Sequence, residues 1–263
     1  MDTQIESSSG RGFIASLNQE ACSHRAVNHP YLQQLIDGDL PDIQGALNDF
    51  VYQYSAYSGD FVRYLTATIS QLKDKGHRKA LLKNLMEESG RIDDEDAAFL
   101  KTIGIELEWV AGLPHTDLYA RYLDAVGIND EYRSRTPYSD EALIWRKLFY
   151  SACAKEGPAR ALGAIGLGTE NIVKYVYRPL VGAIERHLDV SLRDRVFFDL
   201  HAALDDQHGD TLMEIAADYA DSDENRAALR EGMLIALNLR NSFFDSLQAR
   251  ANAMTPVQLS AGY

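Results

Sequence analysis

The stretch LHAALDDQHGD, residues 200–210, places two histidines and an aspartate at the spacing His-x3-Asp-x2-His. The residues on both sides of it are typical of a helix. On a helix that turns by about 100° per residue, Asp205 lies about 40° and His208 about 20° around the axis from His201. The three side chains therefore project from one stripe of the helix.

Two imidazoles and a carboxylate on one helix face suit a first-row transition metal, and iron above all when other carboxylates lie nearby. A soluble helix rarely turns three such groups inward unless something neutralises and coordinates them. The motif therefore predicts a metal enzyme, and further ligands are expected on other helices.

The composition limits the size and the partners of the protein. The chain has 263 residues, of which 46% are hydrophobic, and no break in composition divides it, so one domain with a large core is expected. The net charge of −13 and a pI near 4.9 make binding to nucleic acid or to an anionic membrane surface unfavourable.

The cysteines and the termini indicate a cytoplasmic protein. Cys22 and Cys153 are the two cysteines, so no disulfide framework is expected. The polar N-terminus lacks the apolar segment of a secretion signal, and no run approaches 18 apolar residues. We therefore expect neither export nor a membrane span.

Strand signals are almost absent, because no segment alternates apolar and polar residues and no hairpin dipeptide joins β-branched runs. The sequence predicts an all-α fold, a compact bundle of seven or more helices. Residues 1–11 are expected to form a disordered tail, 12–254 a single helical domain and 255–263 a flexible C-terminus. The expected helices cover residues 13–25, 31–38, 43–72 with a bend at 58–59, 77–89, 115–127, 139–155, 159–187, 191–220 and 224–252.

Glu170 is the first candidate ligand outside the motif, since it is the one carboxylate in the apolar, glycine-rich segment 161–177. Buried carboxylates are almost always paired or metal-bound. Gly163 and Gly166 each weaken a helix by about 1 kcal/mol relative to alanine. We interpret them as leaving space above the metal for substrate and dioxygen. The alternative is close helix packing, with Glu170 paired to an arginine.

Two further candidates come from other predicted helices. On the helical wheel of residues 77–89, Glu88 falls at the edge of the apolar stripe formed by Leu81, Leu82, Leu85 and Met86, whereas Glu87 lies nearly opposite and is expected to meet solvent. His115 opens an amphipathic helix, although periodicity alone does not favour it as a ligand. The remaining histidines lie in polar contexts and are expected to be structural or exposed, namely His24, His29, His77 and His187.

Four segments in this order resemble the haem-oxygenase-like diiron oxidases, relatives of the TenA, PqqC and chlamydial CADD folds. The resemblance runs from about residue 28 to 250. Its segments are NLMEESG at 84–90, HTDLYARYLDAVG at 115–127, ALGAIGLGTENIV at 161–173 and FFDLHAALDDQH at 197–208. The last segment is the most specific.

The resemblance implies six metal ligands, which are Glu88, His115, Glu170, His201, Asp205 and His208. The spacing departs from the family pattern, in which the histidine follows the first glutamate much more closely. Residues 104–114 look like part of an insertion before the histidine. Asp94 or Glu95 could have taken over the ligand role, but His115 is preferred because the residues after it match so closely.

The same resemblance implies a cofactor and a reaction. Two Fe(II)/Fe(III) ions would activate dioxygen, the co-substrate, through a peroxo-diferric species that oxidises a small-molecule substrate, with an external electron donor. We favour a free amino acid or a close derivative from specialised metabolism. The alternatives are a fatty-acid oxidative decarboxylase and a self-sacrificing CADD-like synthase that consumes its own tyrosine and lysine. A homodimer and a non-enzymatic iron scaffold stay open.

The sequence gives a few hints about the substrate site. Lys174 and Arg178 follow Glu170 at helical spacing and could reach a substrate carboxylate, or they could form a solvated basic stripe. Hydroxyl groups are expected around the cavity from Tyr119, Tyr122, Tyr175 and Tyr177. Cys153 would have to be the nucleophile of a TenA-like hydrolase, but its helix is typical of core packing. A haem oxygenase proper would leave the His-x3-Asp-x2-His motif unexplained.

Overall fold

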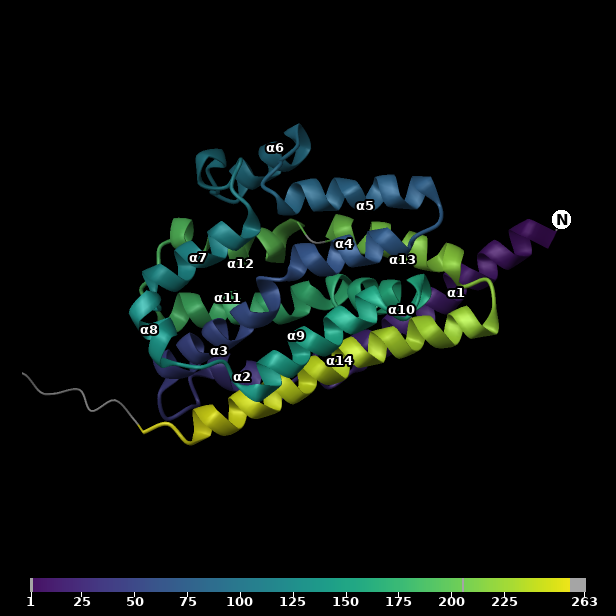
Figure 1. Ribbon diagram of the computed structural model, residues 1–263. Helices are drawn as coiled ribbons and strands as arrows, with labels where there is room; N and C mark the ends of the chain where they lie inside the picture. Colours follow the sequence, from purple (N-terminus) through teal and green to yellow (C-terminus); the bar gives the residue numbers. More distant parts are fainter. Residues whose placement is uncertain (1, 205, 256–263) are drawn as a thin grey trace, which may run out of the picture.

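The computed structural model describes residues 2–204 and 206–255, and the side chains of residues 10–203 and 209–255. Within these ranges every regular element is a helix and none is a strand, which confirms the predicted all-α class (Figure 1). The elements are α1 (Asp2–Ser23), α2 (Pro30–Asp37), α3 (Ile43–Ser58), α4 (Phe61–Gln71), α5 (Lys75–Glu88), α6 (Asp94–Thr102), η1 (Leu107–Trp109), α7 (His115–Ala125), α8 (Asp130–Arg135), α9 (Asp140–Ala154), α10 (Pro158–Leu162), η2 (Gly163–Leu167), η3 (Glu170–Ile172), α11 (Val173–His187), α12 (Leu192–Leu204), α13 (Asp206–Tyr219) and α14 (Asp223–Asn252).

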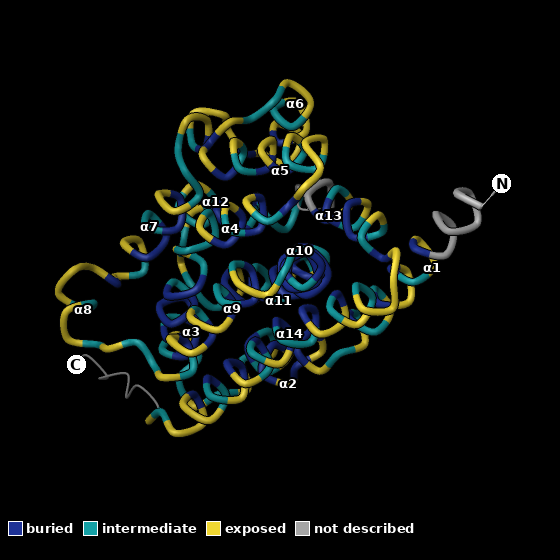
Figure 2. Tube along the Cα trace, turned by 45° about the vertical axis from the view of Figure 1, so that its right-hand side comes forward, coloured by how far each residue is buried: buried dark blue, intermediate teal, exposed yellow. Residues whose placement is uncertain are grey.

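The helices are arranged in layers. Helices α9, α10 and α11 run through the middle, with α14 and α2 on one side and α4, α12 and α13 on the other (Figures 1 and 2). Helix α14 contacts α9, α10 and η2 along its length. Helices α5 and α6 lie outermost, beyond α4 and α13, and in both views they project from the body of the bundle. No described helix combines the length and the apolar character that a membrane crossing requires.

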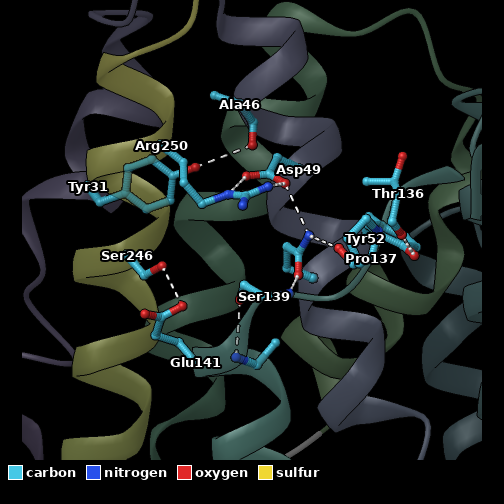
Figure 3. Close-up of polar contacts among 12 residues, drawn as sticks. Tyr31, Ala46, Asp49, Tyr52, Thr136, Pro137, Ser139, Glu141, Ser246 and Arg250 are labelled. Carbon is cyan, nitrogen blue, oxygen red and sulfur yellow. Dashed lines mark hydrogen bonds and ion pairs between the residues drawn. The ribbon is translucent and has the colours of Figure 1, made fainter.

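An ion pair between the buried Asp49 and the exposed Arg250 joins α3 to α14 at one end of the bundle (Figure 3). The Arg250 guanidinium donates two hydrogen bonds, of 2.7 and 2.6 Å, to the Asp49 carboxylate. The Gln53 amide donates to Asp49 over 3.4 Å and accepts the backbone N–H of Ser139 over 2.7 Å. Because a bidentate pair fixes both position and orientation, these contacts set the register of α3, α9 and α14.

Helix α1 begins at Asp2, within residues 1–11, the segment for which the sequence predicts a disordered tail. The packed part of the helix provides the nucleus, and extending an existing helix costs little per residue. Gly10 is buried against α13, where an added Cβ would lie 2.6 Å from the Ala217 carbonyl oxygen. Residues 256–263, most of the predicted flexible C-terminus, lie outside the described part of the chain.

The helix predicted over residues 159–187 is interrupted. It divides into α10, the π-helical turn η2, the short η3 and then α11. The glycines in this segment lie against other helices: an added Cβ on Gly163 would strike the Leu229 carbonyl oxygen of α14, and one on Gly168 would lie 2.6 Å from the Ala236 Cβ. The interpretation that Gly163 and Gly166 leave space above a metal is therefore wrong. They allow the backbone of η2 to pack directly on α13 and α14.

Candidate metal centre

Three side chains from three helices converge beneath the outer layer. Glu88 lies at the end of α5, His115 at the start of α7 and His201 near the end of α12. One donor atom of each lies within 4.8 Å of the donors of the other two. The His115 and His201 ring centroids are 4.7 Å apart. Three of the six predicted ligands thus meet in space although they are widely separated along the chain.

Helix α5 turns Glu88 inward, as predicted, but not through the expected apolar stripe. Its buried residues are Leu81, Asn84 and Glu88, whereas Leu82 and Met86 are each 46% exposed. The stripe was misplaced because α5 lies on the outside of the bundle and presents polar side chains to the site. Glu87 is half-buried instead of solvated, and its carboxylate lies 3.4 Å from the Lys83 ammonium group.

His115 reaches Glu88 because the intervening segment closes on itself. The backbone N–H of Gly112 donates to the Gly90 carbonyl over 2.8 Å. Gly90 has φ +94°, and an added Cβ would lie 2.5 Å from the Leu113 nitrogen. The insertion predicted around residues 104–114 forms η1 and projects with α6, while its base is held at these two glycines. Asp94 and Glu95, the alternative ligands, are exposed in the first turn of α6.

The contact between Glu88 and His115 brings two possible metal donors together. His115 Nδ1 lies 3.0 Å from Glu88 Oε2, but the geometry is not that of a hydrogen bond, and Nδ1 is buried with no hydrogen-bond partner in the described residues. Two donor atoms that approach without a hydrogen bond are expected where both point at a shared cation. This donor set of nitrogen and carboxylate oxygen fits iron.

His201 is oriented by its own helix. Its Nδ1 lies 2.6 Å from the carbonyl oxygen of Phe197, one turn earlier. A proton on Nδ1 that is donated to this carbonyl leaves the Nε2 lone pair free for a metal, as is usual for histidine ligands. The Phe197 and Tyr177 rings contact the imidazole, at centroid distances of 4.3 and 5.7 Å.

Of the other three predicted ligands, Glu170 lies at the same cavity, whereas the side chains of Asp205 and His208 lie outside the described part of the chain. Glu170 opens η3, is 8% exposed and borders the same cavity as the three residues above. Asp205 lies outside the described residues. His208 belongs to α13, but its side chain is outside the described part. The continuous helix predicted over residues 191–220 is described as α12 and α13 on either side of position 205.

A cavity of about 220 Å³ opens beside these groups. Apart from the candidate ligands, its walls consist mainly of aromatic and aliphatic side chains. The lining includes Tyr54, Tyr57, Phe61, Val62, Tyr119, Leu123, Tyr138, Val173, Tyr177 and Phe197. The Tyr54 and Tyr177 hydroxyls are hydrogen-bonded to each other over 2.9 Å. Burial raises the pKa of both Tyr57 and Tyr119, so these phenols keep their protons at neutral pH.

The prediction that four tyrosines supply hydroxyl groups around the cavity is confirmed in part. Tyr119 and Tyr177 border the cavity, Tyr122 is buried but is not part of the described lining, and Tyr175 is 41% exposed. Lys174 and Arg178 are not among the lining residues; Lys174 lies over the Tyr175 ring at 5.4 Å.

The lining also contains residues that sequence reasoning missed. Tyr54 and Tyr57 belong to the run YQYSAYSG at 52–59, whose tyrosine spacing was the available signal. Among the described residues that line the cavity, Arg133 is the one basic residue of the lysine or arginine type. Its Nη2 atom lies 3.2 Å from the Asp124 carboxylate.

Comparison with known proteins identifies the family. The sequence profile of the iron-containing redox enzymes matches residues 48–241, so the chain belongs to this family. Two relatives are 4-aminobenzoate synthases: that of Chlamydia pneumoniae is 23% identical over 242 residues, 90% of this chain and 96% of the relative. That of Chlamydia muridarum is 24% identical over 237 residues, 89% and 90% of the two chains.

Solved structures confirm the haem-oxygenase-like fold. A CADD-like protein of unknown function from Nostoc punctiforme gives a TM-score of 0.73 at 16% identity, covering 93% of this chain and 99% of that one. A protein with a haem-oxygenase-like fold from Shewanella denitrificans gives 0.66 at 16% identity, with 90% and 89% covered. A TenA homologue from Pseudomonas syringae gives 0.65 at 15% identity, with 90% and 91% covered.

Proposed function

We propose that this protein is a diiron oxidase that uses dioxygen to oxidise a small molecule. Glu88, His115, Glu170, His201, Asp205 and His208 would hold the two irons. The observation that carries the proposal is the convergence of Glu88, His115 and His201, from three separate helices, on one side of a largely apolar cavity. Membership of the iron-containing redox enzymes supports iron as the metal.

The protein's own residues prepare the site. When bound, the irons supply the electrons that activate dioxygen and the oxidising power that attacks the substrate. His201 is held by the Phe197 carbonyl, and Glu88 is held in place by the packing of α5. The aromatic walls exclude water, which strengthens electrostatic interactions within the cavity. An external electron donor would restore the reduced metal.

The size of the cavity favours a compact substrate. A volume of about 220 Å³ lies below the roughly 300–1,000 Å³ of typical ligand pockets. A free amino acid or a close derivative needs less room than an extended fatty acid. We therefore retain an amino-acid derivative as the substrate class and place a fatty-acid decarboxylase second to it.

Anaerobic iron titration followed by oxygen-uptake measurements tests this function. The expected result is about two irons per chain, the number of a two-metal site, and oxygen consumption that rises with the right amino-acid derivative. His115→Ala and His201→Ala should lower both. Unchanged iron binding in both variants, or iron loading without any oxygen uptake, would contradict the proposal.

The relatives favour a second candidate. The two chlamydial 4-aminobenzoate synthases align over about nine-tenths of this chain. A chain of the self-sacrificing type would consume a tyrosine of its own, and the Tyr54–Tyr177 pair lies beside His201. It would form less than one product molecule per chain without added substrate, together with a tyrosine mass loss. Many turnovers per chain would exclude this candidate.

A further inference from the structure

Arg240 is a buried charge for which the described residues provide no hydrogen-bond acceptor. It lies on α14 and is 0% exposed. Within the described part of the chain, its Nε, Nη1 and Nη2 atoms make no hydrogen bond. A buried ion without a partner lowers the stability of the folded state. Arg240 is also absent from the lining of the cavity, so substrate contact does not account for it.

The guanidinium lies against an aromatic stack. Its Cζ is 5.0 Å from the centre of the Trp145 ring. The Trp145 and Tyr57 rings are stacked, with centroids 4.0 Å apart and an interplanar angle of 14°. The charge of Arg240 also acts on Tyr57, where it opposes the rise in pKa that burial causes. Arg240 therefore places a positive potential over both rings.

These two rings occupy the middle of an aromatic route from the candidate metal centre to the surface. Beside His201, the Tyr177 hydroxyl is hydrogen-bonded to that of Tyr54. Tyr54 then contacts Trp145 at 5.7 Å and Tyr57 at 5.6 Å between ring centroids.

From Tyr57 the route continues outward. Tyr64 lies at a centroid distance of 5.4 Å, and the half-buried Tyr150 lies 6.4 Å beyond Tyr64. Both branches from Tyr54 therefore pass a ring on which the charge of Arg240 acts.

We propose that Arg240 is an electrostatic barrier on this route, which confines one-electron oxidation to the Tyr177–Tyr54 pair beside the metal centre. The inference rests on the proposed function. Removing an electron from Trp145 leaves a radical cation, because no described residue accepts a hydrogen bond from its buried indole N–H and could take the proton. A guanidinium at 5.0 Å disfavours that second positive charge.

Tyr57 meets the same obstacle. Its hydroxyl has the neutral Thr169 hydroxyl at 3.5 Å as its hydrogen-bond partner, so no base is placed to accept its proton. If the barrier were removed, electrons would pass inward along the rings to the oxidised site. The last electron would come from Tyr150, which would release its hydroxyl proton to water and remain as a phenoxyl radical.

Radical trapping tests the barrier. The full chain is loaded with ferrous iron and exposed to oxygen without substrate, in the presence of a nitroso spin trap. Peptide mass spectrometry then locates the adducts. Arg240→Met removes the charge, Arg240→Lys keeps it, and Arg240→Met/Tyr150→Phe removes the terminal phenol.

The expected result is an increase of at least about tenfold in the adduct on Tyr150 in Arg240→Met, since an unscreened charge at this distance changes the oxidation equilibrium strongly. Arg240→Lys should resemble the parent chain, and the double variant should lose the adduct. Equal Tyr150 labelling in the parent chain and Arg240→Met would overturn the barrier, as would an Arg240→Lys chain that behaves like Arg240→Met.

Arg240→Gln replaces Arg240→Met if that variant fails to fold. Absence of oxygen uptake by the parent chain would count against the proposed function, whereas oxygen uptake with unchanged labelling would count against the barrier alone.

Discussion

His115 Nδ1 lies 3.0 Å from Glu88 Oε2 although residues 89–114 intervene between them. The contact depends on the closure of that segment at Gly90 and Gly112. Two buried donors without a hydrogen bond between them are the local sign of a cation site, and His201 and Glu170 border the same cavity.

Glu88→Gln should bind less iron than the parent chain, because the amide removes the negative charge and one of the expected ligands. Glu87→Gln is the matched control: it loses an ion pair to the exposed Lys83, worth about 0.2–1 kcal/mol, and should bind iron normally. Metal analysis of both proteins after anaerobic loading measures the difference. An equal loss of bound iron in Glu88→Gln and Glu87→Gln would show that Glu88 has no special role as a ligand.

Gly90→Ala should weaken iron binding as well as stability. The alanine would adopt a left-handed conformation, at a cost of about 1–2 kcal/mol, and its Cβ would press on the Leu113 backbone and displace His115. Gly104→Ala is the control, since Gly104 also has a positive φ of +82° but its added Cβ would lie 3.8 Å from the nearest atom. Calorimetric titration of iron should separate the two variants; similar affinities would contradict the role of the closure.

Gly163→Ala should lower the free energy of unfolding by about 1–3 kcal/mol or more, because the added methyl group overpacks the contact with α14. Gly182→Ala in α11, where no atom lies within 4 Å of the added Cβ, should raise the same quantity by about 0.5–1 kcal/mol. Urea denaturation measures both values. A stabilising Gly163→Ala would mean that η2 and α14 are further apart than the structure indicates.

His29 should make stability depend on pH. Its Nδ1 accepts the Tyr31 N–H at the start of α2, and burial lowers its pKa below the ordinary 6.5, although the hydrogen bond to Asp245 opposes the shift. As the pH falls below about 6.5, the unfolded chain takes up a proton that the folded chain resists, so stability is lost. His29→Asn keeps an N-cap acceptor but does not titrate.

The difference in unfolding free energy between His29→Asn and the parent chain should therefore shift in favour of the variant as the pH falls from 7.5 to 5.5. Chemical denaturation at a series of pH values measures it. Parallel curves for the two proteins would show that His29 does not contribute to the acid sensitivity.

Sequence periodicity predicted the inward position of Glu88, because the turn angle of a helix is fixed. The shared face of the His-x3-Asp-x2-His motif stays a prediction, since Asp205 and the side chain of His208 lie outside the described residues. The helical wheel of α5 wrongly predicted that Leu82 and Met86 are buried. Both are exposed, because the neighbouring helices determine which face of an outer helix is covered.

Long-range packing set the features that the sequence did not reveal. The approach of His115 to Glu88 depends on a backbone hydrogen bond at the base of an insertion, and periodicity carries no information about such closure. Gly163 looked like a source of space, but its role is decided by the Leu229 backbone of a helix far along the chain. The contributions of Tyr54 and Tyr57 to the cavity likewise depend on how α3 is placed.

The most direct test is a crystal structure of the protein loaded anaerobically with ferrous iron, with anomalous diffraction recorded at the iron edge. We predict two iron peaks about 3.5–4 Å apart, one contacting Glu88 and His115, with Glu170, His201, Asp205 and His208 completing the two coordination spheres. Absence of iron at full loading, with Glu88 and His115 hydrogen-bonded to each other in its place, would contradict the account.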